Sequence, residues 1–265
     1  MAIAEVNGQR LAYDEHGSGD ALLWAHNLLL DRSFWGPLIE SLPTWRSVAW
    51  DCRYHGDTVG DGQPVTMSDL ADDALALMDH LDIDTAVWIG EGTGVTTALH
   101  AALKAPDRVR ALVLIGGTAT SSPPEEASAV KAVLESWVAH GPETGVFMST
   151  ALAAVGGNTD AAHDLIARWK RARWREFTPL IELVTERPDL TDRLHEIQCP
   201  TLVMHGTCDL FVDPQEAETI FSGISGSRYE PIHDVQQGLS ILYDARVGQH
   251  LRSFLTDILD GAQQK

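Results

Sequence analysis

The sequence predicts an α/β fold: a mostly parallel central sheet with helices on both faces and an inserted helical cap. Short apolar strands alternate with helical patterns over residues 1–119, which is typical of a parallel sheet buried on both faces. The alternation stops over residues 120–196, where the patterns are mostly helical, and resumes over residues 197–265. We therefore expect a core of residues 1–119 and 197–265. The cap, residues 120–196, should cover the carboxyl ends of the strands, where open α/β sheets bind ligands.

The first part of the core contains five predicted strands and two predicted helices. The first long helix, "DLADDALALMDHLDI", keeps apolar residues at a 3.6-residue period, and Ser68 is placed to cap its N-terminus. The second helix follows a glycine-rich turn that ends at Gly94. The predicted strands are "RLAYDEHG", "ALLWAH", "RSVAWDCR", "AVWIG" and "RALVLIGG".

The second part of the chain supplies the cap and then completes the core. The helical patterns of the cap are "EEASAVKAVLESWVAH", "ETGVFMSTALAAV", "DAAHDLIARWKRARW" and "EFTPLIELVTE". After them come the strand "PTLVMHG", a helix from about Pro214, the strand "SRYEPIH" and the amphipathic helix "ARVGQHLRSFLTDIL". The sequence thus predicts a sheet that the cap interrupts and that is completed after it.

The composition restricts the classes of function. A net charge of -19 disfavours an extended nucleic-acid surface, which needs basic residues to face phosphates. Neither a signal peptide nor an apolar run of about 18 residues is visible, so we expect no membrane span and a cytoplasmic protein. The scattered cysteines and the histidine spacing fit neither a disulfide framework nor a metal site. We expect a small-molecule substrate, no metal and no cofactor, and the sequence leaves a homo-oligomer open.

The stretch "VWIGEGTGVTTALHAAL" predicts a strand, a glycine turn and a helix. A dinucleotide-binding turn needs G-x-G-x-x-G and an acidic residue about 20 positions on. Val95 occupies the last glycine position, and the next strand ends without a carboxylate. A nucleophile elbow needs glycines two residues before and two after the nucleophile, which Gly90 and Gly94 provide. The pattern therefore favours an elbow, with Gly92 at the position of the nucleophile.

Two residues in the last third of the chain support the elbow. In enzymes with this turn, an acid and then a histidine follow the last strands. Asp209 follows the strand "PTLVMHG", and His233 follows the strand "SRYEPIH". With these residues the chain resembles the α/β-hydrolase fold family over nearly its whole length. It is most similar to 3-oxoadipate enol-lactonase-like hydrolases, which similarly place Asn where others have Gly in the segment "LLWAHNLLLDRSFW".

The resemblance implies roles for individual residues. The backbone N–H groups of Leu28 and Thr93 would form the oxyanion hole, and Asp209 would orient His233 over Gly92. Because glycine has no side chain, no acyl-enzyme can form through Gly92. The candidate substrate contacts are His26, Asn27, Glu91, Trp169, Arg171 and Arg173, and His26 also suits a structural role.

Three functions remain open at this point. The first is an enzyme for a small ester or lactone, of Ser-Asp-His design, in which this copy is inactivated at Gly92; Gly92→Ser would then restore turnover. The second is a natural serine-less hydrolase or lyase that uses His233 and Asp209 as a general base. The third is a non-catalytic small-molecule binder on the same scaffold, because a fold alone does not establish chemistry.

A cluster of cations distinguishes the cap from the rest of this acidic chain. Residues 168–175 read "RWKRARWR". Arg171 and Arg173, with Trp169, would hold an anionic substrate, because the guanidinium fork suits a carboxylate. The alternative is a solvated helix face whose side-chain stems cover apolar surface.

Overall fold

A computed structural model describes residues 1–142, 145–157, 160–242 and 245–263 of the chain. Within these residues the core is an eight-stranded sheet in the order β1-β2-β4-β3-β5-β6-β7-β8. β2 pairs antiparallel with β1 and β4, and the other neighbours are parallel. The strands are β1 (Ala2–Val6), β2 (Gln9–His16), β3 (Ala21–Ala25), β4 (Arg46–Trp50), β5 (Ala86–Glu91), β6 (Val109–Ile115), β7 (Thr201–Gly206) and β8 (Arg228–Ile232).

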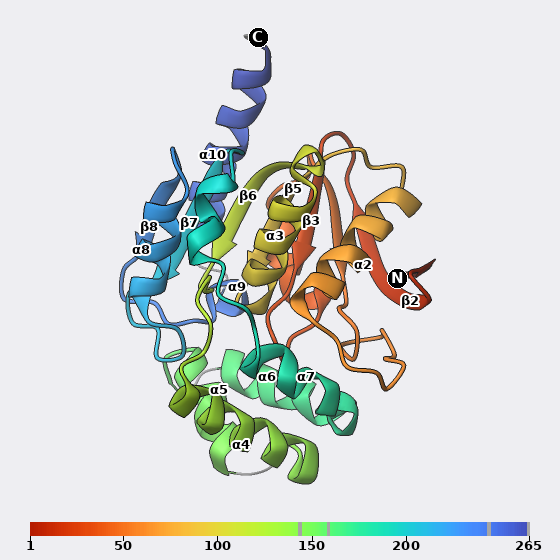
Figure 1. The fold of residues 1–265 in the computed structure, drawn as a ribbon, viewed down its shortest axis with the longest axis vertical. Coiled ribbons are helices and arrows are strands. Elements are labelled where there is room, and N and C mark those ends of the chain that lie inside the picture. Colours follow the sequence, from red (N-terminus) through yellow and green to blue (C-terminus); the bar gives the residue numbers. More distant parts are fainter. Residues whose placement is uncertain (143–144, 158–159, 243–244, 264–265) are drawn as a thin grey trace.

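Helices cover both faces of the sheet, as the alternating pattern predicts (Figure 1). Helices α2, α3 and α8 pack on one face, and α1 and α10 pack on the other. None of the described helices is long and apolar enough to cross a membrane. The bounds of the helices outside the cap are α1 (Gly36–Glu40), α2 (Met67–His80), α3 (Thr93–Lys104), α8 (Pro214–Gly223), α9 (Leu239–Leu242) and α10 (Ala245–Gln263).

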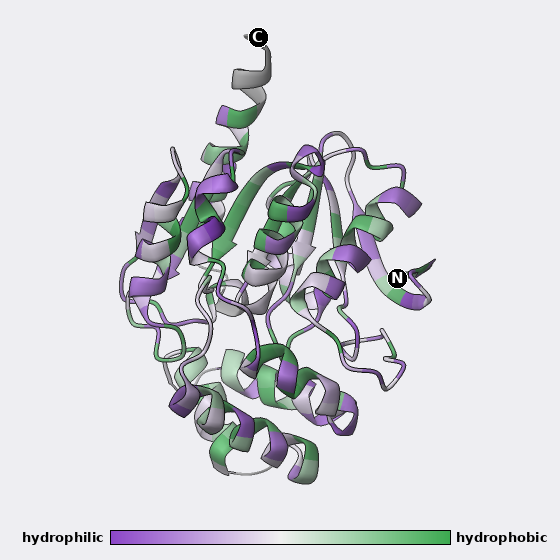
Figure 2. Ribbon diagram, viewed as in Figure 1, coloured by the Kyte–Doolittle hydropathy of each residue, from purple (hydrophilic) through white to green (hydrophobic). Residues whose placement is uncertain are grey.

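Successive residues of the strands enter two different hydrophobic cores. Leu23 and Trp88 pack into the core beneath α2 and α3, whereas Trp24 and Ile89 pack into the core beneath α1 and α10. This alternation follows from the two-residue period of a strand. Figure 2 shows hydrophobic residues concentrated on the central strands and hydrophilic residues on outward turns of the helices. Both faces of the sheet are therefore buried.

Helix α2 begins differently from the sequence-based prediction. Its N-cap is Thr66 rather than Ser68. The Thr66 hydroxyl accepts a hydrogen bond from the Asp69 N–H at 3.1 Å, and the Asp69 carboxylate accepts one from the Thr66 N–H at 2.8 Å. This reciprocal capping box satisfies two N–H groups at once, which a cap at Ser68 would not do.

Four helices form an insertion between β6 and β7, as predicted. Figure 1 shows them lying together across one end of the sheet. Aromatic rings form their core: the Trp137 ring centroid is 4.7 Å from that of Phe147 and 5.4 Å from that of Trp169. The helices are α4 (Pro124–His140), α5 (Gly145–Ala154), α6 (Asp160–Arg171) and α7 (Thr178–Thr185). The boundaries at residues 120 and 196 stay a prediction.

Candidate active site

The glycine turn joins β5 to α3 in the conformation of a nucleophile elbow. Gly92 is the N-cap of α3, with φ 55° and ψ -114°, a backbone conformation that strains other residues. A Cβ on Gly90 would lie 2.3 Å from the Gly94 carbonyl oxygen, and one on Gly94 would lie 2.1 Å from the Ala25 carbonyl oxygen. The two flanking glycines are therefore required by close backbone approaches on either side of residue 92.

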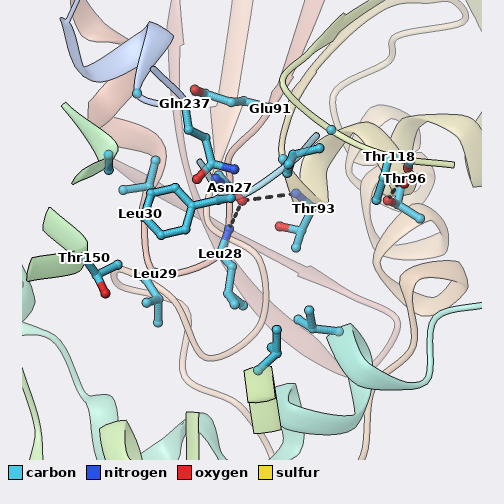
Figure 3. A pocket seen from close by; sticks show the side chains of 18 of the residues that line it. Asn27, Leu28, Leu29, Leu30, Glu91, Thr93, Thr96, Thr118, Thr150 and Gln237 are labelled. Carbon is cyan, nitrogen blue, oxygen red and sulfur yellow. Dashed lines mark hydrogen bonds between the residues drawn. The ribbon is translucent and has the colours of Figure 1, made fainter. Parts of the chain in front are cut away.

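The N–H groups predicted to form an oxyanion hole converge on one oxygen atom. The Leu28 N–H and the Thr93 N–H donate to Asn27 Oδ1 with donor–acceptor distances of 2.8 and 3.2 Å (Figure 3). Two N–H groups at such distances from one oxygen have the geometry that stabilises an oxyanion. In this structure the Asn27 carboxamide occupies the hole.

The Asn27 side chain also fills the space above the turn. A Cβ on Gly92 would lie 1.9 Å from Asn27 Oδ1 and 2.1 Å from Asn27 Cγ. A serine at position 92 would therefore require Asn27 to adopt another rotamer. Gly92 and Asn27 are mutually compatible, whereas Gly92→Ser alone would clash with the Asn27 side chain until that side chain moved.

Asp209 is buried beyond the end of β7, and its carboxylate accepts hydrogen bonds from backbone N–H groups of the loop that follows it. Its Oδ1 accepts hydrogen bonds from the N–H groups of Phe211 and Val212 at 2.8 and 3.1 Å. Its Oδ2 lies 3.3 Å from His205 Nε2, which instead donates to the Val212 carbonyl oxygen at 3.0 Å. Among the described residues, Oδ2 therefore has no hydrogen-bond partner.

The structure does not bring His233 to the turn, contrary to our expectation. His233 follows β8 on an exposed turn, it is absent from the lining of the cavity above Gly92, and no hydrogen bond joins it to Asp209 within the described residues. Gln237 from the same loop lines that cavity. The Gln237 carbonyl oxygen and Asp209 Oδ2 each lie about 4 Å from the Cβ position of Gly116. The loop that carries His233 therefore presents Gln237, rather than the histidine, to the cavity above the turn.

A cavity of about 250 Å³ lies between the turn and the cap, and we call it the inner cavity. Its walls are mostly apolar, and Figure 3 shows Asn27, Glu91, Thr93 and Gln237 among its polar side chains. Pockets of this character bind small molecules and use a few polar groups to orient them. Its other lining residues are Leu28, Leu29, Leu30, Met67, Gly92, Thr96, Gly117, Thr118, Glu126, Val130, Thr150, Ala154, Leu165, Trp169, Val184, Arg187, Phe211, Val212 and Gly238.

Glu91, the residue before the turn, is a buried carboxyl group with incomplete hydrogen bonding. Its Oε1 lies 3.5 Å from the Ser240 N–H nitrogen, and its Oε2 has no partner among the described residues. Burial, with a smaller contribution from the nearby charge of Asp209, raises the pKa of Glu91 to about 7. Glu91 therefore titrates near neutral pH.

The cap cations line a second cavity, of about 300 Å³, which we call the outer cavity. Arg171 and Arg173 face this cavity and do not line the inner one, whereas Trp169 lines both. Leu29 also lines both cavities. The Trp169 indole N–H donates to the Leu29 carbonyl oxygen at 2.8 Å, so this bond joins two residues of the partition between the cavities. The arginines predicted to bind an anionic substrate thus line the outer cavity and not the cavity above the turn.

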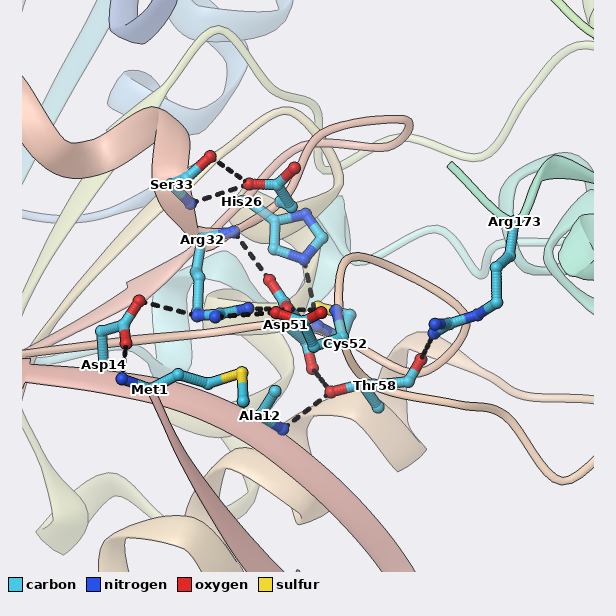
Figure 4. Close-up of polar contacts among 12 residues, drawn as sticks. Met1, Ala12, Asp14, His26, Arg32, Ser33, Asp51, Cys52, Thr58 and Arg173 are labelled. Carbon is cyan, nitrogen blue, oxygen red and sulfur yellow. Dashed lines mark hydrogen bonds and ion pairs between the residues drawn. The ribbon is translucent and has the colours of Figure 1, made fainter. Parts of the chain in front are cut away.

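The cations of the outer cavity differ in how they are paired. Arg173 donates to the Thr58 carbonyl oxygen at 2.9 Å and to the Glu176 carboxylate at 3.2 Å (Figure 4). Arg168 pairs with Asp164. Arg171 is exposed and has no partner in the part of the chain that the structure describes. Arg173 therefore ties the cap to the core.

His26 is hydrogen-bonded to the backbone of Asn27, next to the oxyanion-hole residue Leu28, and it does not line either cavity. Its Nε2 accepts a hydrogen bond from the Cys52 N–H at 3.0 Å (Figure 4). Its Nδ1 must then carry the proton that is donated to the Asn27 carbonyl oxygen at 2.8 Å. The structural role for His26 is the one that this geometry favours.

Comparison with known proteins assigns the family. A family model described as the alpha/beta hydrolase fold matches residues 17–236. The chain belongs to the α/β-hydrolase family. By family it is a hydrolase for small-molecule substrates. It is 27% identical to a non-heme haloperoxidase of Rhodococcus erythropolis over 96% of this chain and 98% of the relative.

Solved structures of other α/β-hydrolases are similar along the whole chain. An esterase from Thermogutta terrifontis, solved with malate bound, has a TM-score of 0.89 and 26% identity, covering 97% of this chain and 98% of that one. An enol-lactonase from Burkholderia xenovorans LB400 has a TM-score of 0.81 and 24% identity, covering 96% and 99%. The latter likeness supports the fold, while the proposed kinship with enol-lactonases stays a prediction.

Sequence reasoning missed the threonines at 96, 118 and 150 of the inner cavity and three larger polar residues, Gln237, Arg187 and Glu126. Gln237 is four residues from His233, and glutamine in a loop carries no chemical signal of its own. Arg187 and Glu126 lie far apart in sequence, so no motif joins them. Within the described residues, no group of three His, Cys, Asp or Glu side chains could hold a metal ion.

Proposed function

We propose that this α/β-hydrolase binds a small ester, lactone or related carbonyl compound in the inner cavity without forming an acyl-enzyme. The observation that carries the proposal is the convergence of the Leu28 and Thr93 N–H groups on a single oxygen, Asn27 Oδ1. A ligand carbonyl oxygen would take the place of Asn27 Oδ1 once that side chain turns away. Esters and lactones are favoured because the solved relatives include an esterase and an enol-lactonase.

Three features argue against an acyl-enzyme. Gly92 offers no attacking atom, and the loss of the nucleophile costs other triad enzymes on the order of 10⁶ in rate. Among the described residues no histidine lines the cavity, and the polar side chain that the His233 loop contributes is the Gln237 amide, which does not accept a proton at neutral pH. His233 is exposed and away from the cavity, so the general-base alternative built on His233 and Asp209 has no geometric support.

Binding would proceed by exchange of one acceptor for another. Asn27 Oδ1 accepts hydrogen bonds from the two N–H groups in the absence of ligand. The binding free energy of a ligand carbonyl therefore includes only the difference between its hydrogen bonds and those of Asn27. A typical hydrogen bond contributes about 1 kcal/mol net. Removing the competing amide with Asn27→Ala should therefore tighten the binding of phenyl acetate about fivefold in an NMR titration.

The proposal predicts which substitutions create turnover. With p-nitrophenyl acetate, we expect no burst from the wild type, which lacks a nucleophile at residue 92. We expect none from Gly92→Ser alone, because no histidine among the described residues lines the cavity to act as its base. The triple variant Asn27→Ala, Gly92→Ser, Gln237→His should show a burst that approaches one equivalent. Adding Asp209→Asn to the triple variant should suppress that burst.

Two results would contradict the proposal. A stoichiometric burst from the wild-type protein would show that a nucleophile other than residue 92 is present. Unchanged or weaker binding of phenyl acetate by Asn27→Ala would show that the Leu28 and Thr93 N–H groups do not receive the ligand carbonyl.

A further inference from the structure

The described lining of the inner cavity includes one arginine, Arg187, which follows helix α7 near the end of the cap. Its Nε–H donates to the Thr120 carbonyl oxygen at 2.9 Å, and one Nη1–H donates to the Val184 carbonyl oxygen at 3.1 Å. These bonds fix the guanidinium at the junction of cap and core. Because arginine has five N–H donors, three remain without a hydrogen bond to the described residues.

The positive charge of Arg187 is only partly compensated. The nearest carboxylate in the cavity wall, Glu126 on helix α4, lies 3.7 Å from Nη2, which is beyond hydrogen-bond distance. The Arg187 side chain is 10% exposed, whereas the Glu126 side chain is 52% exposed. Burial lowers the pKa of Arg187, and the charges of Glu126 and Glu216 offset this only in part. Arg187 still carries its charge at neutral pH, since free guanidinium pKa values exceed 12.

An under-compensated cation in an apolar cavity selects for an anion. A carboxylate would accept two parallel N–H bonds from the guanidinium, and such charge-assisted pairs are about twice as strong as neutral hydrogen bonds. We propose that the inner cavity binds a small organic carboxylate, with its anionic group on Arg187 and a carbonyl group of the same molecule on the Leu28 and Thr93 N–H groups. The second half of this statement rests on the proposed function, and the first half does not.

The size of the cavity limits the ligand. An apolar cavity of about 150 Å³ holds one benzene molecule, which corresponds to roughly 25 Å³ per non-hydrogen atom. The inner cavity, at about 250 Å³, therefore accommodates on the order of ten non-hydrogen atoms. A keto acid or ester acid of that size fits this volume, whereas a long acyl chain does not.

The test compares two ligands of nearly the same shape, one with a charged terminal group and one with a neutral terminal group. 5-Oxohexanoate carries a ketone and a carboxylate, and 5-oxohexanamide replaces the carboxylate with a neutral amide. By calorimetric titration at pH 7.5, wild type should bind the keto acid 10- to 100-fold more tightly, as expected for a hydrogen bond to a charged group. Arg187→Gln should remove this preference, because it should weaken the binding of the keto acid far more than that of the amide.

A second variant acts in the opposite direction and does not depend on the survival of the Arg187 contacts. Glu126→Gln removes the competing carboxylate from a half-exposed helix position, so it should tighten keto-acid binding several-fold and leave amide binding unchanged. Glu125→Gln, the exposed neighbour outside the cavity lining, is the matched control and should change neither affinity.

The outcomes separate the two proposals. If wild type binds keto acid and amide equally, Arg187 is not an anion anchor, while the proposed carbonyl site stands. If Arg171→Gln abolishes the preference and Arg187→Gln does not, the anion is held in the outer cavity and the inference is overturned. If neither ligand binds, the proposed function fails and this inference fails with it.

Discussion

The buried carboxyl group of Glu91 should make the stability of this protein fall as the pH rises from about 4.5 to about 7. Glu91 lies at the end of β5, with one oxygen 3.5 Å from the Ser240 nitrogen and the other without a partner among the described residues. Glu91→Gln replaces this group with a neutral one of the same shape. It should therefore remove one titration and leave the packing intact.

The sign and size of the effect follow from the pKa of the group. Burial raises the pKa of Glu91 from 4.5 to about 7 in the folded protein. Between these values the folded state binds more protons than the unfolded state, so the free energy of unfolding declines as the pH rises. At ~1.4 kcal/mol per pKa unit, the charged form costs on the order of 3 kcal/mol above pH 7. Below pH 4.5 the cost is absent in the wild type.

The measurement is urea unfolding of wild type and Glu91→Gln between pH 4.5 and 8.5. The difference in the free energy of unfolding should grow in favour of the variant by roughly 3 kcal/mol across this range, and most of the growth should lie between pH 5 and 7. Glu182→Gln, an exposed glutamate on α7, should track the wild type. A difference between Glu91→Gln and wild type that is constant with pH would refute the reasoning, since it would show that Glu91 is charged throughout.

Two further predictions concern the partition and the thiols. Trp169→Phe keeps an aromatic ring but removes the hydrogen bond to the Leu29 carbonyl oxygen. It should lower the free energy of unfolding in urea by about 1 kcal/mol and weaken the binding of phenyl acetate. No change in either quantity would mean that the bond does not hold the loop. Among the cysteines, Cys208 is exposed, whereas burial raises the pKa of Cys52 well above its usual value. A thiol reagent should therefore label Cys208 within minutes and Cys52 only on unfolding, and early labelling of Cys52 would contradict its burial.

The architecture was predictable because its signals are local. The core strands after β1 were visible as short apolar or alternating segments, and the cap was visible as the interval in which strands disappear. Among the strands of the described residues, β1 (Ala2–Val6) was missed, because it is a mostly exposed edge strand without an apolar run. The short helices α1 and α9 were missed as well. The glycines at 90 and 94 were equally readable, because each is required by backbone atoms within the turn or on the neighbouring strand.

The contents of the site were decided by packing between distant segments. His233 and Gln237 lie in one loop, and the sequence favours the histidine on chemical grounds. Val235, between them, is buried, and its carbonyl oxygen accepts a hydrogen bond from the Cys208 N–H at 3.0 Å. With the loop anchored there, His233 is left in solvent and Gln237 reaches the cavity.

The sequence by itself therefore determined the sheet, the cap, the sharp turn and the absence of a side chain at residue 92. Only the tertiary structure decided that Asn27 Oδ1 accepts from the Leu28 and Thr93 N–H groups, and that Gln237 and Arg187 line the inner cavity whereas His233 does not. The physical reason is that periodicity and close backbone contacts are properties of short segments. The direction of a polar side chain in a loop depends instead on which distant groups satisfy its hydrogen bonds and charge.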